Sequence, residues 1–92
     1  MMEIRWTSKA LSDLARLHEF LNLKNPSAAA KAVQAIVSAP EVLWAHPRIG
    51  ERIEEFAPRE VRRLLALNYE MRYEIQSDVI YLLRIWPTRE DR

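Results

Sequence analysis

The sequence predicts an α+β domain in which a curved antiparallel sheet packs on an α-helical hairpin, in the element order β-α-α-β-β-β. Two stretches near the C-terminus predict the sheet. Residues 69–75 alternate bulky and charged side chains, as a half-buried strand does, and residues 79–86 are almost continuously apolar, as in a strand covered on both faces. Apolar residues at helical spacing between positions 8 and 45 predict the hairpin.

The predicted sheet has four strands, near residues 3–6, 60–67, 68–75 and 79–86. The last two strands form a hairpin. A three-residue loop at 76–78 places Tyr73 opposite Tyr81 and Glu70 opposite Arg84. A two-residue loop instead turns Arg84 toward the apolar face, so we favour the first register.

Capping residues delimit the helices within 8–45. The pair Thr7-Ser8 is an N-cap candidate for the first helix, on which Asp13 is expected to point outward with the other polar residues. Asn25 followed by Pro26 is typical of an N-cap with proline in the first helical position, so a second helix begins there. Its small apolar residues allow close approach, which favours an antiparallel pair of helices.

The loop between positions 47 and 58 contains the single glycine of the protein, Gly50. A chain that uses glycine once is expected to use it where φ must be positive. We therefore predict a turn with positive φ at Gly50.

The composition restricts the class of protein. A chain of 92 residues with 49% hydrophobic content predicts one domain over residues 1–92. The absence of cysteine and of a long apolar run favours a cytoplasmic protein without a membrane span. No phosphate-binding glycine loop and no histidine pair at metal spacing is present, so neither a cofactor nor a metal is expected. Eleven of the 14 basic residues are arginine, although the net charge is only +1.

Three strings in the chain, HPRIGER, EVRRLLALNYEMRYEI and IYLLRIWPTRE, together with the order of elements, resemble the RelE/ParE superfamily of bacterial toxins from two-gene toxin–antitoxin systems. The resemblance covers nearly the whole chain. It implies one of two activities, because RelE-like members cut messenger RNA in the ribosome and ParE-like members block DNA gyrase.

The residues at the RelE-type catalytic positions favour the ParE-like activity. When the tyrosine of the third strand is matched to Tyr69, the basic positions upstream fall at Val61 and Arg63, the next arginine falls at Glu70, and the last falls at Arg89. The C-terminal tyrosine of RelE-like members has no counterpart. RNA cleavage needs positive charge around the phosphate, which a carboxylate at Glu70 opposes. A gyrase inhibitor is therefore the first hypothesis, an mRNA interferase the second, and a non-toxic structural or adaptor module the third.

The resemblance also implies the partners, which are a cognate antitoxin and DNA gyrase, or the ribosome and mRNA in the alternative. An aromatic anchor flanked by arginines predicts a target-binding group of Trp86, Arg84 and Arg89. The resemblance, together with the incompletely covered sheet, implies antitoxin contacts at Arg62, Arg63, Tyr69 and Tyr73. If the protein is a ribonuclease, the catalytic pair is Arg63 and Arg89. Sequence-specific DNA binding by the toxin alone is not expected.

Overall fold

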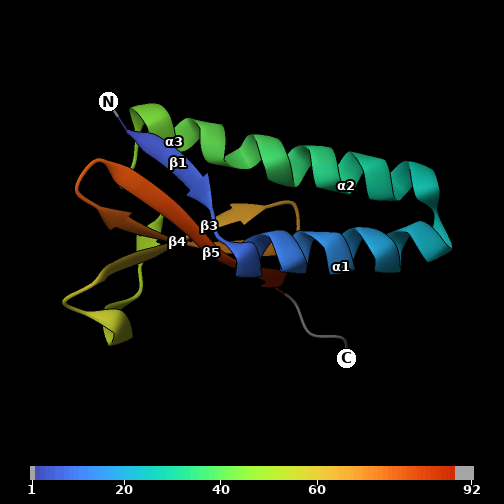
Figure 1. The fold of residues 1–92 in the computed structure, drawn as a ribbon. Coiled ribbons are helices and arrows are strands. Elements are labelled where there is room, and N and C mark those ends of the chain that lie inside the picture. Colours follow the sequence, from blue (N-terminus) through green and yellow to red (C-terminus); the bar gives the residue numbers. More distant parts are fainter. Residues whose placement is uncertain (1, 89–92) are drawn as a thin grey trace.

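A computed structural model describes residues 2–88 and confirms the α+β fold (Figure 1). The strands are β1 (Glu3–Trp6), β2 (Glu51–Arg52), β3 (Glu60–Ala66), β4 (Tyr69–Gln76) and β5 (Val79–Pro87). The helices are α1 (Ser8–Lys24), α2 (Pro26–Ser38) and the short α3 (Val42–Ala45), with 3-10 turns at Ala39–Glu41 and Glu54–Phe56.

The sheet is mixed and has five strands, in the order β1-β5-β4-β3-β2, where four antiparallel strands were expected. β3, β4 and β5 form the predicted antiparallel meander. β1 instead runs parallel to β5, from Glu3 beside Val79 to Trp6 beside Leu82. The two-residue strand β2 was not predicted. It lies in the loop that precedes β3 and pairs antiparallel with β3.

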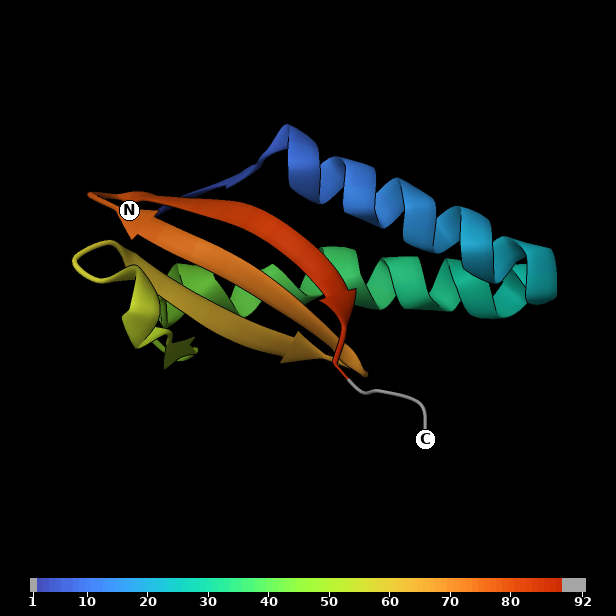
Figure 2. The ribbon, with the colours of Figure 1, turned by 90° about the horizontal axis from the view of Figure 1, so that it is seen from below.

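The helical hairpin lies against one face of the sheet, and its tip extends beyond the ends of the strands (Figures 1 and 2). Both predicted caps are confirmed. The Thr7 side chain accepts a hydrogen bond from Ala10 N, and the Asn25 side chain accepts one from Ala28 N. Pro26 occupies the first position of α2. These caps satisfy backbone N–H groups at the start of each helix, which would otherwise lack partners.

The core lies between the helices and the face of β3, β4 and β5 that they cover. Its largest fully buried side chains are Tyr73, Ile36, Leu43, Met71, Ile80 and Leu82. The burial of β4 and β5 is the reverse of the prediction, in which β4 was the half-buried strand and β5 the strand covered on both faces. On β4 the charged residues Glu70 and Glu74 are also buried, whereas β5 alternates between buried and half-buried positions. β4 is central in the sheet, but β5 has a strand partner on its outer side only as far as Leu82.

The predicted register of the β4–β5 hairpin is wrong. The loop has two residues, because Gln76 pairs with Val79, and Tyr73 therefore lies opposite Leu82. The register then shifts by one residue between Arg72 and Tyr73, so that Arg84 pairs with Arg72. Such a bulge inserts one extra residue into β5 and keeps Arg84 off the apolar face, which a regular two-residue hairpin could not do.

The β3–β4 turn places a bulky residue in the left-handed region, because Leu67 has φ 57° and is 67% exposed. Leucine is strained there and asparagine is much less so. We expect Leu67→Asn to raise the free energy of unfolding by about 0.5 to 1 kcal/mol in urea denaturation. Leu65→Asn, at a similarly exposed position in β3, is the control and should give no such gain. An equal or greater gain from the control would contradict the backbone explanation.

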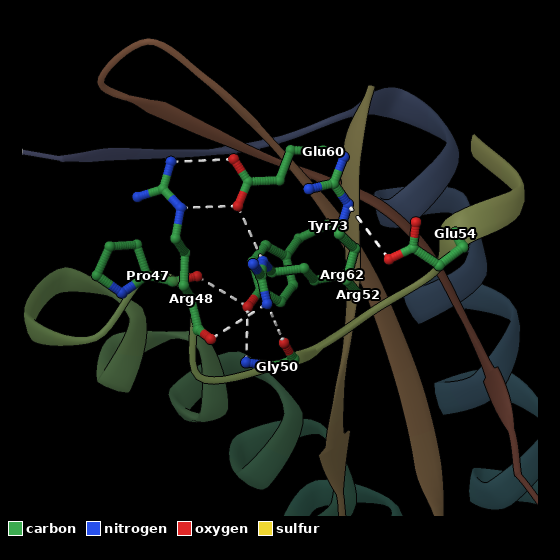
Figure 3. Close-up of polar contacts among 8 residues, drawn as sticks. All are labelled: Pro47, Arg48, Gly50, Arg52, Glu54, Glu60, Arg62 and Tyr73. Atoms are coloured by element: carbon green, nitrogen blue, oxygen red, sulfur yellow. Dashed lines mark hydrogen bonds and ion pairs between the residues drawn. The ribbon is translucent and has the colours of Figure 1, made fainter. Parts of the chain in front are cut away.

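Gly50 is required for close packing, and the prediction of a positive φ at this residue is wrong. An added Cβ would collide with the carbonyl oxygen of Arg63 and would lie 2.6 Å from the hydroxyl of Tyr73. Figure 3 shows why the chain comes so close. Gly50 N donates to the Tyr73 hydroxyl at 3.0 Å, and that hydroxyl donates to the carbonyl oxygen of Pro47 at 2.8 Å.

Arg62 on β3 also holds the loop around Gly50 in place, and its side chain lies beside Tyr73 in Figure 3. Arg62 donates to the carbonyl oxygen of Gly50 at 2.7 Å and to the carboxylate of Glu60 at 3.0 Å. Arg48 binds both carboxylate oxygens of Glu60, at 2.8 and 3.0 Å. Burial would raise the pKa of Glu60, but the hydrogen bonds from Arg48 and Arg62 outweigh it and hold that pKa below its ordinary value.

Candidate functional site

Three arginines form a row across the sheet. Arg63 on β3 pairs directly with Arg72 on β4, and Arg72 pairs directly with Arg84 on β5. Arg72 lies between the core residues Met71 and Tyr73, so it projects from the face opposite the helices, and its cross-strand partners share that orientation. Like charges in directly opposed positions repel each other. The row is therefore stable only if nearby groups compensate it.

Glu70 and Asp13 provide much of this compensation. The buried carboxylate of Glu70 lies between two members of the row, 3.3 Å from Arg72 Nη2 and 3.5 Å from Arg63 Nη1. Glu51 lies 3.5 Å from Arg63 Nε. Arg63 Nε is nevertheless buried without a hydrogen bond to any residue of the described segment 2–88.

Asp13 compensates Arg84 at the outer edge of β5, and the expectation that Asp13 points outward is wrong. Its side chain is 5% exposed and accepts hydrogen bonds from Arg84 Nε at 2.8 Å and Arg16 Nη2 at 2.7 Å. It also accepts from the backbone N–H of Ile85 at 2.9 Å. Beyond Leu82 this edge has no β1 partner, so a carboxylate of α1 takes the place of a strand.

The pKa of Asp13 reflects this environment. Burial alone would raise the pKa of the carboxyl group, but the hydrogen bonds from Arg84 and Ile85 and the charges of Arg84 and Arg16 lower it below its ordinary value. Arg84 responds in the opposite direction, since its hydrogen bond to Asp13 raises its own pKa. Both groups are therefore charged at neutral pH.

Aromatic rings enclose the centre of the row. The guanidinium carbon of Arg72 lies 4.6 Å from the centroid of the Trp86 ring and 5.4 Å from that of Phe56. Arg84 also lies over Trp86, at 5.7 Å. A cation over an aromatic face is attracted by the quadrupole of the ring. Trp86 is thus held at the end of β5 by two arginines, and it remains partly exposed.

The structure separates the predicted site residues into different environments. Arg63, Arg84 and Trp86 belong to the row and its aromatic contacts. Arg62 and Tyr73 fasten the loop around Gly50; the Arg62 side chain is 16% exposed and Tyr73 is fully buried. Tyr69 is 7% exposed and lines a cavity beside Trp86. Arg89 lies outside the described residues.

Sequence reasoning missed Arg72, Phe56 and Asp13. The alternation of charges along β4 places Arg72 on the face away from the core and was therefore a usable signal. The bulge that brings Arg84 and Trp86 beside Arg72, and the loop that brings Phe56 over it, leave no local pattern in the sequence.

Residues 2–88 contain no group of three or more His, Cys, Asp or Glu side chains placed to hold a metal ion. None of the helices in that segment combines the length and the apolar character needed to cross a membrane.

Comparison with known proteins places the chain in a family. The family of the ParE toxin of the type II toxin–antitoxin system parDE matches residues 4–92. The chain belongs to this family. In fold it is similar to a chain of the chromosomal ParDE toxin–antitoxin system from P. aeruginosa, with a TM-score of 0.81 and 28% identity over 97% of this chain and 98% of that one.

Two curated relatives come from Caulobacter vibrioides. Toxin RelE3 is 28% identical over 92 residues, which cover 100% of both chains. Toxin RelE2 is 26% identical over 86 residues, which cover 92% of this chain and 93% of that one. The chain is thus a toxin of the RelE/ParE superfamily, as its sequence motifs predicted.

Proposed function

We propose that this toxin acts by binding DNA gyrase and that a cognate antitoxin neutralises it. The observation that carries the proposal is the position of Glu70, 3.5 Å from Arg63 and 3.3 Å from Arg72. RNA cleavage requires cationic groups that stabilise the charge developing on the phosphate. A buried carboxylate between two of these cations reduces the positive potential available to a transition state. The arrangement favours binding over cleavage.

Trp86 with Arg84 and Arg72 is the proposed contact with the target. Tryptophan and arginine are the residue types that most often dominate the energy of protein interfaces. The two arginines hold the ring in place, at 4.6 and 5.7 Å, so little side-chain freedom remains to be lost on binding. Arg89 completes the proposed group.

An mRNA interferase is the second candidate. It is favoured by the names of the relatives from Caulobacter, which are RelE toxins, and by the unbonded Nε of Arg63. In this alternative Arg63 and Arg89 form the catalytic pair and the partners are the ribosome and mRNA. A non-toxic adaptor module is the third candidate, and it predicts that expression without the antitoxin does no harm.

The deciding experiment compares the purified protein in a gyrase supercoiling assay and in a ribosome-dependent mRNA cleavage assay. The proposal predicts inhibited supercoiling and intact mRNA. Codon-phased cuts in the mRNA with normal supercoiling would replace it with the second candidate. Cell growth unaffected by expression, with neither activity in vitro, would favour the third.

We expect Trp86→Ala to weaken inhibition of supercoiling, because it removes the aromatic anchor. The expected loss is about 1 to 3 kcal/mol of binding to gyrase, measured as the shift in the inhibitory concentration. Trp44→Ala is the matched control, since Trp44 is 54% exposed on α3 and distant in sequence from the row. An equal loss in both variants would remove Trp86 from the proposed interface.

The antitoxin is proposed to cover apolar surface that the fold leaves exposed and to pair its acidic residues with arginines. The exposed apolar side chains of the described residues include Leu65 and Leu67 near the β3–β4 turn and Phe20 and Leu23 near the tip of the helical hairpin. Coexpression with the product of an adjoining gene should raise the thermal stability of the toxin and remove its effect on growth. Because both proposed partners act inside the cell, the proposed location is the cytoplasm.

A further inference from the structure

A cavity of about 290 Å³ lies between α1 and the outer edge of β5, beyond the point where β1 ends. One part of its lining is apolar, from Leu17, Ile85, Trp86 and Pro87. The other part carries the side chains of Arg16, Arg84 and Tyr69 around the buried Asp13. A cavity of this size is at the lower limit of ligand pockets, so it suits a single side chain and is too small for a nucleotide.

The charges that the described residues place around this cavity do not balance. Two guanidinium groups share one carboxylate, because Asp13 binds both Arg16 and Arg84. A third cation, Lys9, lines the adjoining hollow together with Asp13, Arg16 and Arg84. Asp13 is already surrounded by donors, with Ile85 N–H as an additional one. Among the described residues, a surplus of positive charge therefore surrounds the cavity.

Two guanidinium nitrogens around the opening have no hydrogen-bond partner within the described part of the chain. Arg84 uses Nε and Nη2 for Asp13, which leaves Nη1. Arg16 uses Nη1 for Ser12 and Nη2 for Asp13, which leaves Nε. An anion at the opening would accept hydrogen bonds from two charged N–H donors. Apolar groups of the same ligand would pack on Trp86 and Pro87 beside these donors.

We propose that this cavity receives the carboxylate side chain of an acidic segment of a protein partner, with an apolar residue of the same segment packed on Trp86. The surplus charge selects a carboxylate, the apolar wall selects a polypeptide, and the small volume limits the contact to one side chain. Arg16 is the specificity-determining residue, because its side chain is 66% exposed and its Nε has no hydrogen-bond partner among the described residues. The proposal extends beyond the proposed function, since it requires neither gyrase nor an identified antitoxin.

The test is NMR titration of the purified protein with acetyl-Leu-Glu-Leu-Glu amide, followed by the indole N–H signal of Trp86. The matched probe is acetyl-Leu-Gln-Leu-Gln amide. We expect the glutamate peptide to shift this signal and the glutamine peptide to leave it unchanged. Arg16→Gln should weaken binding about threefold to fivefold. Arg5→Gln removes the same charge from another exposed site, on β1, and should leave binding unchanged.

Three results would overturn the inference. Equal weakening of peptide binding by Arg16→Gln and Arg5→Gln would mean that the affinity depends only on the net charge of the protein. Equal binding of the two peptides would exclude carboxylate recognition. Tighter binding of a short oligouridylate than of the glutamate peptide, lost in Arg16→Gln, would assign the cavity to nucleic acid. All of these readouts are independent of gyrase inhibition, so the inference and the proposed function can fail separately.

Discussion

Replacing Asp13 by alanine is expected to lower the free energy of unfolding by about 3 kcal/mol. The substitution leaves the backbone N–H of Ile85 without its acceptor and returns Arg84 and Arg16 to mutual repulsion. The loss stays moderate because Arg84 is 42% exposed and can be hydrated. Urea denaturation measures the effect. Glu19→Ala removes an exposed carboxylate from the same helix and should change stability little.

The effect of Asp13 should depend on pH. Its pKa is lowered in the folded protein, so the stability that it contributes is complete above the ordinary pKa of about 3.9 and is lost as the pH falls through the folded pKa. The difference in unfolding free energy between the wild type and Asp13→Ala should therefore shrink as the pH falls below about 4. A difference that stays constant between neutral and acidic pH would show that the lost contacts do not require the ionised carboxylate.

Gly50→Ala is expected to lower the free energy of unfolding by about 2 kcal/mol, although alanine normally stabilises a loop by restricting the unfolded chain. The new Cβ would meet the carbonyl oxygen of Arg63, a backbone atom of β3 that cannot move without disturbing the strand. It would also meet the ring of Tyr73, whose Cε1 lies 2.9 Å away. Thermal or urea denaturation measures the loss, with Asp78→Ala in another exposed loop as the control.

A double mutant separates the two collisions of Gly50→Ala. Tyr73→Phe removes the hydroxyl that lies 2.6 Å from the added Cβ, so Gly50→Ala should cost less in that background than in the wild type. The collision with Arg63 remains, and some loss should persist. Strictly additive losses would show that the Tyr73 hydroxyl is not part of the conflict.

The fold was predictable from the sequence because its elements have local signatures. Thr7, Asn25 and Pro26 delimit the helices through contacts with residues a few positions away, and the periodic patterns in the last third of the chain mark the strands. The parallel pairing of β1 was not predictable in this way. It depends on the path that the helical hairpin takes across the sheet before the chain returns in β5.

The candidate site was predictable only in part. Arg63, Arg84 and Trp86 were candidates because of their residue types and the family motifs, and these residues do lie on one region of the sheet. The expectation that Asp13 is exposed failed because its burial satisfies a strand edge that is more than seventy residues distant along the chain. Helical periodicity contains no information about such a contact.

The fold class, the helix boundaries and the superfamily could be predicted without a structure, because each depends on local patterns or on motifs carried within the chain. The pairing of charges could not be predicted in this way. A one-residue bulge aligns Arg84 with Arg72, and a missing strand partner beyond Leu82 draws Asp13 to the edge of β5. Ion pairs act over a few ångströms and change with a shift of one residue in register, so their partners are set by the final packing of the strands.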